Sequence, residues 1–313
     1  MQKIFTLILA LMLALAPAAM ADESYTIGIC QLVQHEALDS STLGFMAAMT
    51  EKLGGKVSFN VQNASGDVAT CISIANSFIA EDVDLIVANS TQALQAAYAS
   101  TGEIPILGTS VTDYAAALDL DTWTGVTGVN VSGTSDLAPL SDQAELIRQL
   151  FPEAQNVGLL YCSAEANSEY QAAIMTGFLT GMGYRCTPYT FTDTNDVFSV
   201  SQTACAASDV IFVPTDNTVA TCTQVIRNAV EMAGTPIIGG DEAICAGTGI
   251  ATLAIDYYDL GYATGEMAYD VLVNGKDVAN MPIRFIPSFT FMYNPEMCEM
   301  LGIEVPSDWT AIG

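Results

Sequence analysis

Short apolar runs along this chain alternate with longer segments of helical periodicity. The clearest example is residues 209–218, where four apolar residues precede the polar turn Pro-Thr-Asp-Asn-Thr and a helix-like run over 219–232. An uninterrupted apolar run is typical of a strand buried on both faces, as in a parallel sheet. The polar residues then fall at the carboxyl end of the strand, which is the edge where open α/β sheets bind ligands.

The same order of parts occurs earlier in the chain. Residues 84–91 contain an acid, an apolar run and then a cluster of amide and hydroxyl side chains. A second matched pair follows, 105–110 in the first half and 236–241 in the second. The paired motifs are 21 residues apart in the first half (84 to 105) and 27 in the second (209 to 236), which favours related architecture over a tandem repeat. Chance similarity between two strand–helix units is the alternative.

Periodicity and glycine or capping residues predict the remaining elements. We expect strands at 25–30, 57–61, 85–88, 104–108, 157–161, 184–190, 237–239 and 250–255. We expect helices at about 40–53, 67–81, 91–100, 137–150, 165–182, 197–207, 219–232 and 257–273. This β-α-β-α order requires a parallel sheet with right-handed crossovers.

The alternation breaks between Ser110 and Asp136. Residues 124–133 are β-branched and punctuated by glycine, so we interpret them as an extended segment that passes between two lobes. The predicted fold class is α/β, with two doubly wound parallel-sheet lobes joined by a three-segment hinge. We assign 22–130 plus 257–283 to the N-terminal lobe and 131–256 plus 284–313 to the C-terminal lobe. Three passages between lobes predict closure around a small ligand.

The first 21 residues have the pattern of a secretory signal peptide. Lys3 supplies a positive start, residues 4–16 form an apolar core, and Ala19-Met20-Ala21 is a small-x-small cleavage site. A retained membrane anchor is the alternative, although the apolar run is short for a stable span. We therefore expect a periplasmic or otherwise exported chain that is soluble after removal of residues 1–21.

Composition favours a large core and excludes some partners. Hydrophobic residues make up 51% of the chain and charged residues 14%, which makes disorder improbable. Eight Lys and Arg stand against 35 Asp and Glu, for a formal net charge of −27. Such a surface repels nucleic acid and anionic lipid, so we expect no nucleic-acid partner. A general adaptation to salt would produce the same acidity.

The eight cysteines permit disulfides in an oxidising compartment. A pairing of Cys222 with Cys245 is our preferred hypothesis because both follow neighbouring predicted strand ends, and buried free thiols are the alternative. No two cysteines have Cys-x-x-Cys spacing, and a single histidine cannot support a Cys/His zinc site. We expect no metal site.

Signatures of common enzyme classes are missing. The chain has no Gly-x-Ser-x-Gly elbow, no Gly-x-x-x-x-Gly-Lys phosphate loop and no complete Gly-x-Gly-x-x-Gly. A catalytic triad would have to use His35, the chain's one histidine. His35 follows the first strand, where a ligand contact, an exposed loop position or catalysis are the three interpretations. We expect no catalytic residue, no enzyme activity and no cofactor, and a secreted enzyme is the rival class.

The positions of the arginines indicate how an anion would be held. Each of the four lies inside a predicted helix or at the amino side of a strand: Arg148, Arg185, Arg227 and Arg284. A ligand carboxylate therefore has no bidentate arginine clamp and must use helix N-termini and hydroxyl groups. Candidates are Ser90, Thr91, Ser110 and Thr112. Ordinary helix capping is the alternative role for these hydroxyls.

Acids after the second-lobe strands favour a cationic group. Glu165, Asp216 and Asp241 follow three of these strands, and amides accompany two of them. An α-ammonium held by one or two of these acids, with a carboxylate at the hydroxyl groups, describes an amino acid. Helix capping is again the alternative for Asp216 and Asp241. The complete predicted ligand-binding set is Gln31, His35, Asn89, Ser90, Thr91, Ser110, Thr112, Glu165, Asn167, Ser168, Asp216, Asn217 and Asp241.

Five motifs in chain order resemble those of one family. They are Ile27-Gly-Ile-Cys-Gln-Leu-Val-Gln-His-Glu-Ala-Leu-Asp39, Val83-Asp-Leu-Ile-Val-Ala-Asn-Ser-Thr91, Tyr161-Cys-Ser-Ala-Glu-Ala-Asn-Ser168, Val213-Pro-Thr-Asp-Asn-Thr-Val219 and Ile255-Asp-Tyr-Tyr-Asp-Leu-Gly261. Together they are similar to substrate-binding proteins of ABC transporters with the type I periplasmic-binding fold. The resemblance implies a two-lobed protein that delivers ligand to a membrane permease, and it implies an aromatic amino acid as ligand. Cys30, Cys71 and Cys162 depart from the family, which usually has Asn- or Ala-type residues there.

The sequence therefore predicts a monomeric, exported receptor of an uptake transporter, selecting an aromatic or related amino acid. A ligand-sensing module that hands its ligand to a membrane receptor would have the same sequence features. A sugar or a nucleoside is the alternative ligand.

Overall fold

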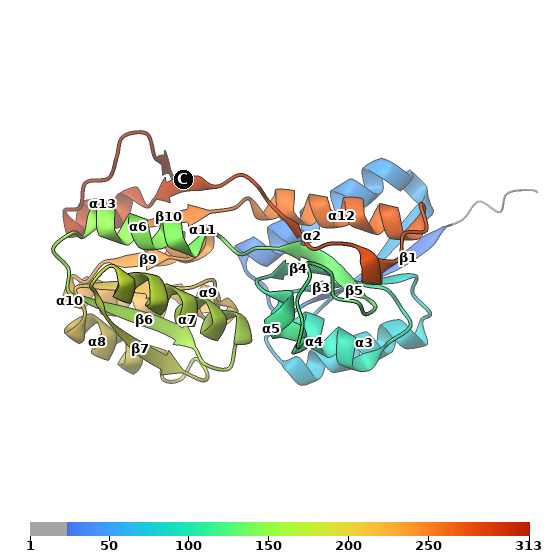
Figure 1. Ribbon diagram of the computed structural model, residues 1–313, viewed down its shortest axis with the longest axis horizontal. Coiled ribbons are helices and arrows are strands. Elements are labelled where there is room, and N and C mark those ends of the chain that lie inside the picture. Colours follow the sequence, from blue (N-terminus) through green and yellow to red (C-terminus); the bar gives the residue numbers. More distant parts are fainter. Residues whose placement is uncertain (1–23) are drawn as a thin grey trace, which may run out of the picture.

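The computed structural model describes residues 24–313 and consists of two α/β lobes side by side (Figure 1). The predicted signal peptide, residues 1–21, lies outside the described residues. One sheet forms the centre of each lobe, and the chain passes between the lobes along one side of the molecule (Figure 1). Among residues 24–313, no helix combines the length and the apolar character needed to cross a membrane.

The first lobe has a six-stranded parallel sheet. Its spatial order is β11 (Arg284–Phe285), β5 (Val131–Ser135), β4 (Ile106–Val111), β3 (Leu85–Asn89), β1 (Tyr25–Gln31) and β2 (Val57–Asn63). The central strand β3 is buried at all five positions, as expected for an apolar strand between two layers of helices.

Helices cover both faces of this sheet. One face packs against α2 (Glu36–Leu53) and α12 (Tyr257–Leu272), with Ile27 and Leu85 beside Phe45 and Met267 in one core cluster. The other face packs against α3 (Val68–Ala80), α4 (Thr91–Ser100) and α5 (Tyr114–Leu118). Successive residues of β1 and β3 point to opposite faces, so each strand contributes to both clusters.

The second lobe has a seven-stranded sheet. Its order is β13 (Thr310–Ala311), β12 (Thr290–Tyr293), β10 (Ala251–Ala254), β9 (Ile237–Gly239), β8 (Val210–Val213), β6 (Asn156–Cys162) and β7 (Arg185–Phe191). Only the pairing of β10 with β12 is antiparallel in this sheet. The helices are α6 (Leu140–Leu150), α7 (Ala166–Gly181), α8 (Val197–Ala207), α9 (Asn217–Thr221), α10 (Thr223–Ala233), α11 (Glu242–Gly247) and α13 (Pro295–Leu301). Two single 3₁₀ turns, η1 (Gly54–Lys56) and η2 (Val278–Asn280), complete the described elements.

The chain crosses between the sheets three times. The crossings run from β5 to α6, from β10 to α12 and from β11 to β12. The predicted boundary at residue 131 lies too early, because β5 pairs with β4 in the first sheet, and the boundary at 284 lies too early because β11 pairs with β5. Gly133 of β5 permits the close packing of β5 against β4. A Cβ at this position would lie 2.1 Å from the Gly108 carbonyl oxygen.

Two further predictions are wrong in detail. The helix expected over 219–232 is divided at Cys222 into α9 and α10, and it begins at Asn217. All eight cysteines lie within the described residues and are free thiols, so the hypothesis of a Cys222–Cys245 disulfide is wrong. The Cys222 thiol instead donates to the carbonyl oxygen of Thr218 over 3.1 Å, within its own turn of chain.

Candidate ligand site

A closed cavity lies between the two lobes, at the carboxyl ends of their parallel strands. We call it the central cavity. Its lining comes from both lobes and from two crossings: His35, Leu38, Ser110, Thr112, Asp136, Asn167, Thr215, Asp216, Asn217, Asp241 and Tyr257. Its volume is about 10 Å³, roughly the space of one water molecule. A larger molecule therefore enters only when the lobes separate.

Asp136 is a fully buried carboxyl group at the end of β5. Its Oδ1 accepts a hydrogen bond from Thr112 Oγ1 at 3.0 Å, and its Oδ2 accepts one from the Tyr257 hydroxyl at 3.1 Å. Burial raises the pKa of Asp136 to about 6, although both hydrogen bonds act in the opposite direction. The group therefore has partners but no counter-cation.

Asp241 occupies the equivalent place after β9. Its Oδ1 accepts from the backbone N–H of Ile244 at 2.8 Å and so caps α11. Burial, together with the neighbouring carboxyl group of Asp136, raises the pKa of Asp241 to about 7, although backbone hydrogen bonds act in the opposite direction. Two acids with raised pKa values on one wall of a closed cavity favour a cationic ligand group.

Glu165 and Asp216 are already saturated by hydrogen bonds from the protein. Glu165 accepts five, from the backbone and side-chain donors of Asn217 and Thr218 and from Asn167 Nδ2, over 2.7–3.2 Å. Asp216 accepts from Val219 N, Cys162 N and Ser168 Oγ over 2.7–2.8 Å. Burial, and then the charge of Glu165, raise the pKa of Asp216 well above its usual range. These two acids hold the β6–α7 and β8–α9 loops together.

Several buried polar atoms around the cavity have no protein partner. They are His35 Nδ1, Ser110 Oγ and Asn167 Oδ1, each on a residue that lines the central cavity. Native proteins pair nearly all such atoms, so an unpartnered atom that faces a cavity indicates a ligand contact. Asn167 Oδ1 is an amide oxygen and can only accept a hydrogen bond, whereas the Ser110 hydroxyl group can donate or accept. Whether His35 Nδ1 donates or accepts depends on the tautomer of the imidazole ring.

The backbone is strained at two neighbouring strand ends. Ser90, after β3, has φ of 123°, and Ser110, in β4, has φ of 54°. Positive φ is unusual for residues with a side chain and concentrates at functional sites. At Ser110 this conformation accompanies the unpartnered hydroxyl group.

Side-chain hydrogen bonds among residues 24–313 connect the lobes directly. His35 Nε2 lies 3.2 Å from Asn217 Oδ1, and Gln92 Nε2 donates to the carbonyl oxygen of Ala164 at 3.2 Å. His35 precedes α2 in the first lobe, whereas Asn217 begins α9 in the second. Both bonds hold the two lobes together across the cleft.

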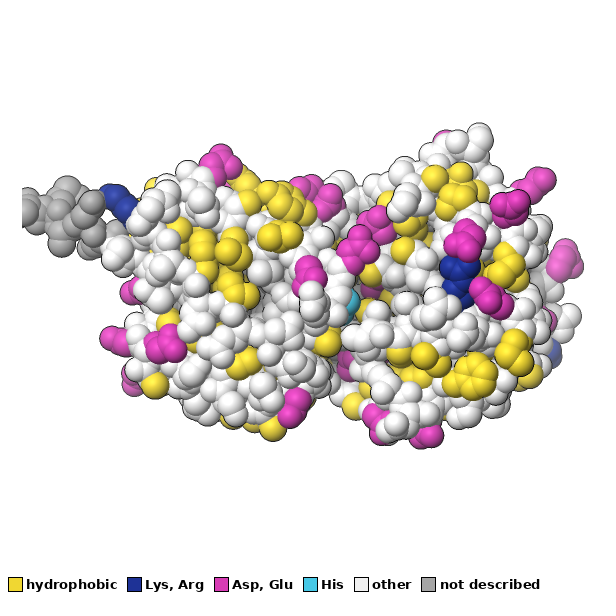
Figure 2. All heavy atoms as spheres, turned by 180° about the vertical axis from the view of Figure 1, so that it is seen from behind, with side chains coloured by type: hydrophobic (Ala, Val, Ile, Leu, Met, Phe, Trp, Pro, Cys, Tyr) yellow, Lys and Arg dark blue, Asp and Glu magenta, His cyan; other side chains and the backbone are white. Residues whose placement is uncertain are grey.

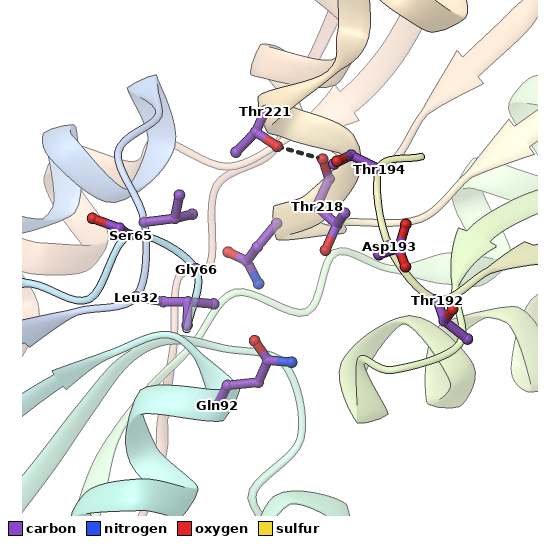
Figure 3. A pocket seen from close by; sticks show the side chains of 11 residues that line it. Leu32, Ser65, Gly66, Gln92, Thr192, Asp193, Thr194, Thr218 and Thr221 are labelled. Atoms are coloured by element: carbon purple, nitrogen blue, oxygen red, sulfur yellow. Dashed lines mark hydrogen bonds between the residues drawn. The ribbon is translucent and has the colours of Figure 1, made fainter. Parts of the chain in front are cut away.

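A second pocket, which we call the mouth pocket, lies beyond Asn217. Its volume is about 420 Å³, and Leu32, Ser65 and Gln92 of the first lobe face Thr192, Asp193 and Thr218 of the second across it (Figure 3). Asn217 lines both this pocket and the central cavity. The side chains that line either space, all within the described residues, include no Lys or Arg. Acidic side chains also stand beside the groove between the lobes in Figure 2.

The comparisons with known proteins agree with this architecture. The sequence model described as ABC transporter substrate binding protein matches residues 26–311. The chain belongs to the ABC transporter substrate-binding protein family. A tyrosine-binding protein of Clostridioides difficile (strain R20291) is 33% identical over 281 residues, which are 89% of this substrate-binding protein and 81% of the relative.

Two solved structures of substrate-binding proteins are similar to this chain. The ABC domain of Streptococcus pneumoniae in complex with L-Trp has a TM-score of 0.88 at 28% identity, covering 93% of this chain and 100% of that one. The ligand-free, open structure of a Clostridium difficile substrate-binding protein with adhesive properties has a TM-score of 0.71 at 34% identity, covering 92% and 99%. The predicted family resemblance and the type I periplasmic-binding fold class are both confirmed.

The lining of the central cavity contains just over half of the residues that the sequence singled out. His35, Ser110, Thr112, Asn167, Asp216, Asn217 and Asp241 line the central cavity; Gln31, Asn89, Ser90, Thr91, Glu165 and Ser168 do not. Gln31 and Asn89 instead form a network with Asp39, Thr42 and the Leu38 carbonyl oxygen that anchors the first turns of α2 to the strand ends. Ser90 caps α4 through Ala93 N.

Sequence reasoning missed three of this protein's polar cavity residues, namely Asp136, Thr215 and Tyr257. Thr215 stood inside the polar turn after β8, and its signal was present in the motif at 209–218. Asp136 directly follows β5, whose hydroxyl-rich sequence with a glycine predicts a crossing segment instead of a strand. Tyr257 was expected only as the first residue of a helix. Among residues 24–313, no group of three or more metal-binding side chains is placed to hold a metal ion.

Proposed function

We propose that this substrate-binding protein captures a free amino acid, with an aromatic one preferred, and delivers it unchanged to the permease of an ABC transporter. The observation that carries the proposal is the central cavity, where Asp136 and Asp241 are buried without a cation. A buried carboxylate is costly unless it is paired, so the cavity favours a ligand that brings an ammonium group. The unpartnered Ser110 hydroxyl is available to donate to the ligand's carboxylate.

The relatives support an aromatic side chain. One is named for tyrosine and another was solved with L-Trp, and they match this chain at 33% and 28% identity. The mouth pocket, with Leu32 and Val33 in its wall, provides about 420 Å³ beside the central cavity for a large side chain. In this proposal the amino and carboxylate groups lie among the residues that line the central cavity, which widens beyond its volume of about 10 Å³ to hold them, and the side chain extends toward the mouth pocket.

The three crossings provide the hinge that admits the ligand. The TM-score is higher against the L-Trp complex than against the open structure, although the identity is lower. That difference supports a closed arrangement of the lobes in this chain. Export by means of residues 1–21 and function as a monomer belong to the same proposal.

A thermal-shift panel of free amino acids, sugars and nucleosides tests the function. At about one hundred times the Kd, a ligand stabilises the protein by about 2.7 kcal/mol, which gives a clear rise in Tm. We expect tyrosine or tryptophan to raise the Tm and Asp241→Asn to abolish the rise. Asp308→Asn is the matched control, because it removes an exposed carboxyl group of the second lobe that lines neither the central cavity nor the mouth pocket, and it should bind normally. A shift by sugars or nucleosides, with none by any amino acid, would overturn the proposal.

A further inference from the structure

Glu165 fixes the orientation of the Asn217 amide group. It accepts five hydrogen bonds, and both of its oxygens act as acceptors because each receives one backbone N–H, from Asn217 or from Thr218. Asn217 Nδ2 is one of these donors, at 2.8 Å from Glu165 Oε2. The NH₂ group of Asn217 therefore faces Glu165, and its carbonyl oxygen Oδ1 faces the opposite lobe.

This orientation fixes the tautomer of His35. Asn217 Oδ1 can only accept, so His35 Nε2, 3.2 Å away, must carry the proton and donate it. Desolvation lowers the pKa of His35 below its ordinary value of 6.5, which keeps the ring neutral at pH 7. In the neutral ring the other nitrogen, Nδ1, then holds a lone pair and no proton. That nitrogen is out of contact with solvent and has no partner in the protein.

We propose that His35 Nδ1 accepts a hydrogen bond from the side chain of the bound amino acid, and so selects a ring that carries an O–H or N–H group. This inference rests on the proposed function, and it names the aromatic side chains that the site prefers. Tyrosine and tryptophan carry such a group, and phenylalanine does not.

The ligand's other groups do not suit His35 Nδ1. A carboxylate would place its own lone pairs against that of the nitrogen. The ammonium group is attracted more strongly to the carboxyl groups of Asp136 and Asp241, which interact with each other and with Tyr257 on the hinge side of the cavity. The charged neighbours of His35 are instead Glu165 and Asp39. A neutral donor on the ligand's side chain is what remains for Nδ1.

The position of the His35–Asn217 pair supports this assignment. Asn217 lines both spaces, so the pair stands where the central cavity meets the mouth pocket. A side chain that extends from the central cavity toward the mouth pocket must pass the imidazole ring. Its ring substituent can then reach Nδ1 while the ammonium group stays with the acids.

The test compares ligands that match in size but differ in the donor. Calorimetry measures the Kd of L-tyrosine and of 4-fluoro-L-phenylalanine, and of L-tryptophan and 1-methyl-L-tryptophan. A buried acceptor left without a donor weakens binding by roughly 10- to 100-fold, so we expect that ratio within the better-bound pair of the wild-type protein. In His35→Leu the ratio should fall to about one.

His35 also bonds the lobes together, and a control separates the two roles. Tyr170→Phe removes the hydrogen bond from the Tyr170 hydroxyl group of α7 to Asp113 of the first lobe, at residues that line neither the central cavity nor the mouth pocket. It should weaken both members of a pair by the same factor and leave their ratio unchanged. A ratio in His35→Leu equal to the wild-type ratio would overturn the inference while leaving the proposed function intact. If no amino acid binds the wild-type protein, the proposed function itself fails.

Discussion

The hydroxyl group of Tyr257 donates a hydrogen bond to Asp136 Oδ2 over 3.1 Å, between residues 121 positions apart in the chain. Asp136 lies on the crossing from β5 to α6, and Tyr257 begins α12 at the end of the crossing from β10. The bond therefore joins two of the three connections between the lobes at the wall of the central cavity. It couples the geometry of the hinge to the carboxyl group that we assign to the ligand's ammonium.

Tyr257→Phe should lower the free energy of unfolding by about 1–3 kcal/mol, because it leaves a buried carboxylate oxygen without its donor. Denaturant unfolding at pH 8 measures the loss. The matched control is Tyr258→Phe, one residue along the same helix, where the side chain is 43% exposed. That substitution should change stability by less than about 0.5 kcal/mol. Equal effects of the two changes would contradict a stabilising role for the Asp136–Tyr257 bond.

Binding should weaken as the pH falls through the range of the two cavity acids. The pKa values of Asp136 and Asp241 are about 6 and about 7 in the folded protein, raised by burial from 3.8. Protonation removes the negative charge that holds an ammonium group, so the ligand-induced rise in Tm should be largest near pH 8 and decline below pH 7. Thermal shifts with saturating tyrosine or tryptophan between pH 5 and pH 8 measure this.

The stability of the ligand-free protein should change in the opposite direction. A raised pKa in the folded state means that the native protein binds more protons, so the contribution of these acids to stability is complete below about pH 4 and is lost as the pH rises through about 6–7. Comparison of the wild type with Asp241→Asn isolates one group, since the variant lacks that part of the pH dependence. A constant difference in unfolding free energy between the two proteins from pH 4 to pH 8 would exclude this linkage.

Glu165 and Asp241 should respond in opposite ways to loss of charge. Glu165→Gln replaces an acceptor of five hydrogen bonds with an amide whose NH₂ group faces donors, and stability should fall by about 3 kcal/mol. Asp241→Asn keeps an oxygen for the Ile244 N–H and removes a buried charge, so stability at pH 8 should hold or rise while amino acid binding is lost. Paired denaturation and calorimetry on the two variants check this. If Asp241→Asn instead unfolded the protein, a structural role would replace the ligand role.

The two-lobed fold was predictable because most strands are apolar and buried on both faces. β3 and β8 each appear in the sequence as an uninterrupted apolar run, and their polar ends were found with them. β5 was not predictable in this way, because it is Val-Ser-Gly-Thr-Ser and yet fully buried. Its hydroxyl groups are satisfied at long range, Thr134 by Thr264 and Ser132 by the Met281 carbonyl oxygen. Local sequence gives no sign of such partners, so both the strand and Asp136 after it were missed.

Tertiary structure also determines which polar residues make hydrogen bonds within the protein and which remain available to a ligand. Sequence position placed Asn89 and Asp241 alike at strand ends, but Asn89 Nδ2 bonds Leu38 O and Thr42 Oγ1 inside the first lobe. Glu165 and Asp241 likewise differ only in how many donors the fold brings to them. A pattern of polar strand ends thus identifies the edge of the sheet, whereas the contacts decide which side chains remain available to a ligand.

The close approach of α2 and α12 should be sensitive to a single methyl group. A Cβ on Gly261 would lie 1.9 Å from the Ser41 carbonyl oxygen, and one on Gly44 would lie 2.0 Å from that of Tyr258. Both contacts are to backbone, so the helices must separate, and Gly261→Ala should destabilise the protein by about 1–3 kcal/mol or more. Gly177→Ala is the control, because this glycine in α7 has open space around it and alanine there should add about 0.5–1 kcal/mol.

The same substitution should also weaken binding, since the two helices carry cavity residues at their N-terminal ends. His35 is the N-cap of α2, and Tyr257 is the first residue of α12. Separation of the helices moves the imidazole away from the carboxyl group of Asp136 that Tyr257 holds, so calorimetry on Gly261→Ala should show a raised Kd for the aromatic amino acid. Gly177→Ala should bind as the wild type does. A destabilised Gly261→Ala protein with unchanged affinity would show that the packing of α2 on α12 supports the fold without positioning the site.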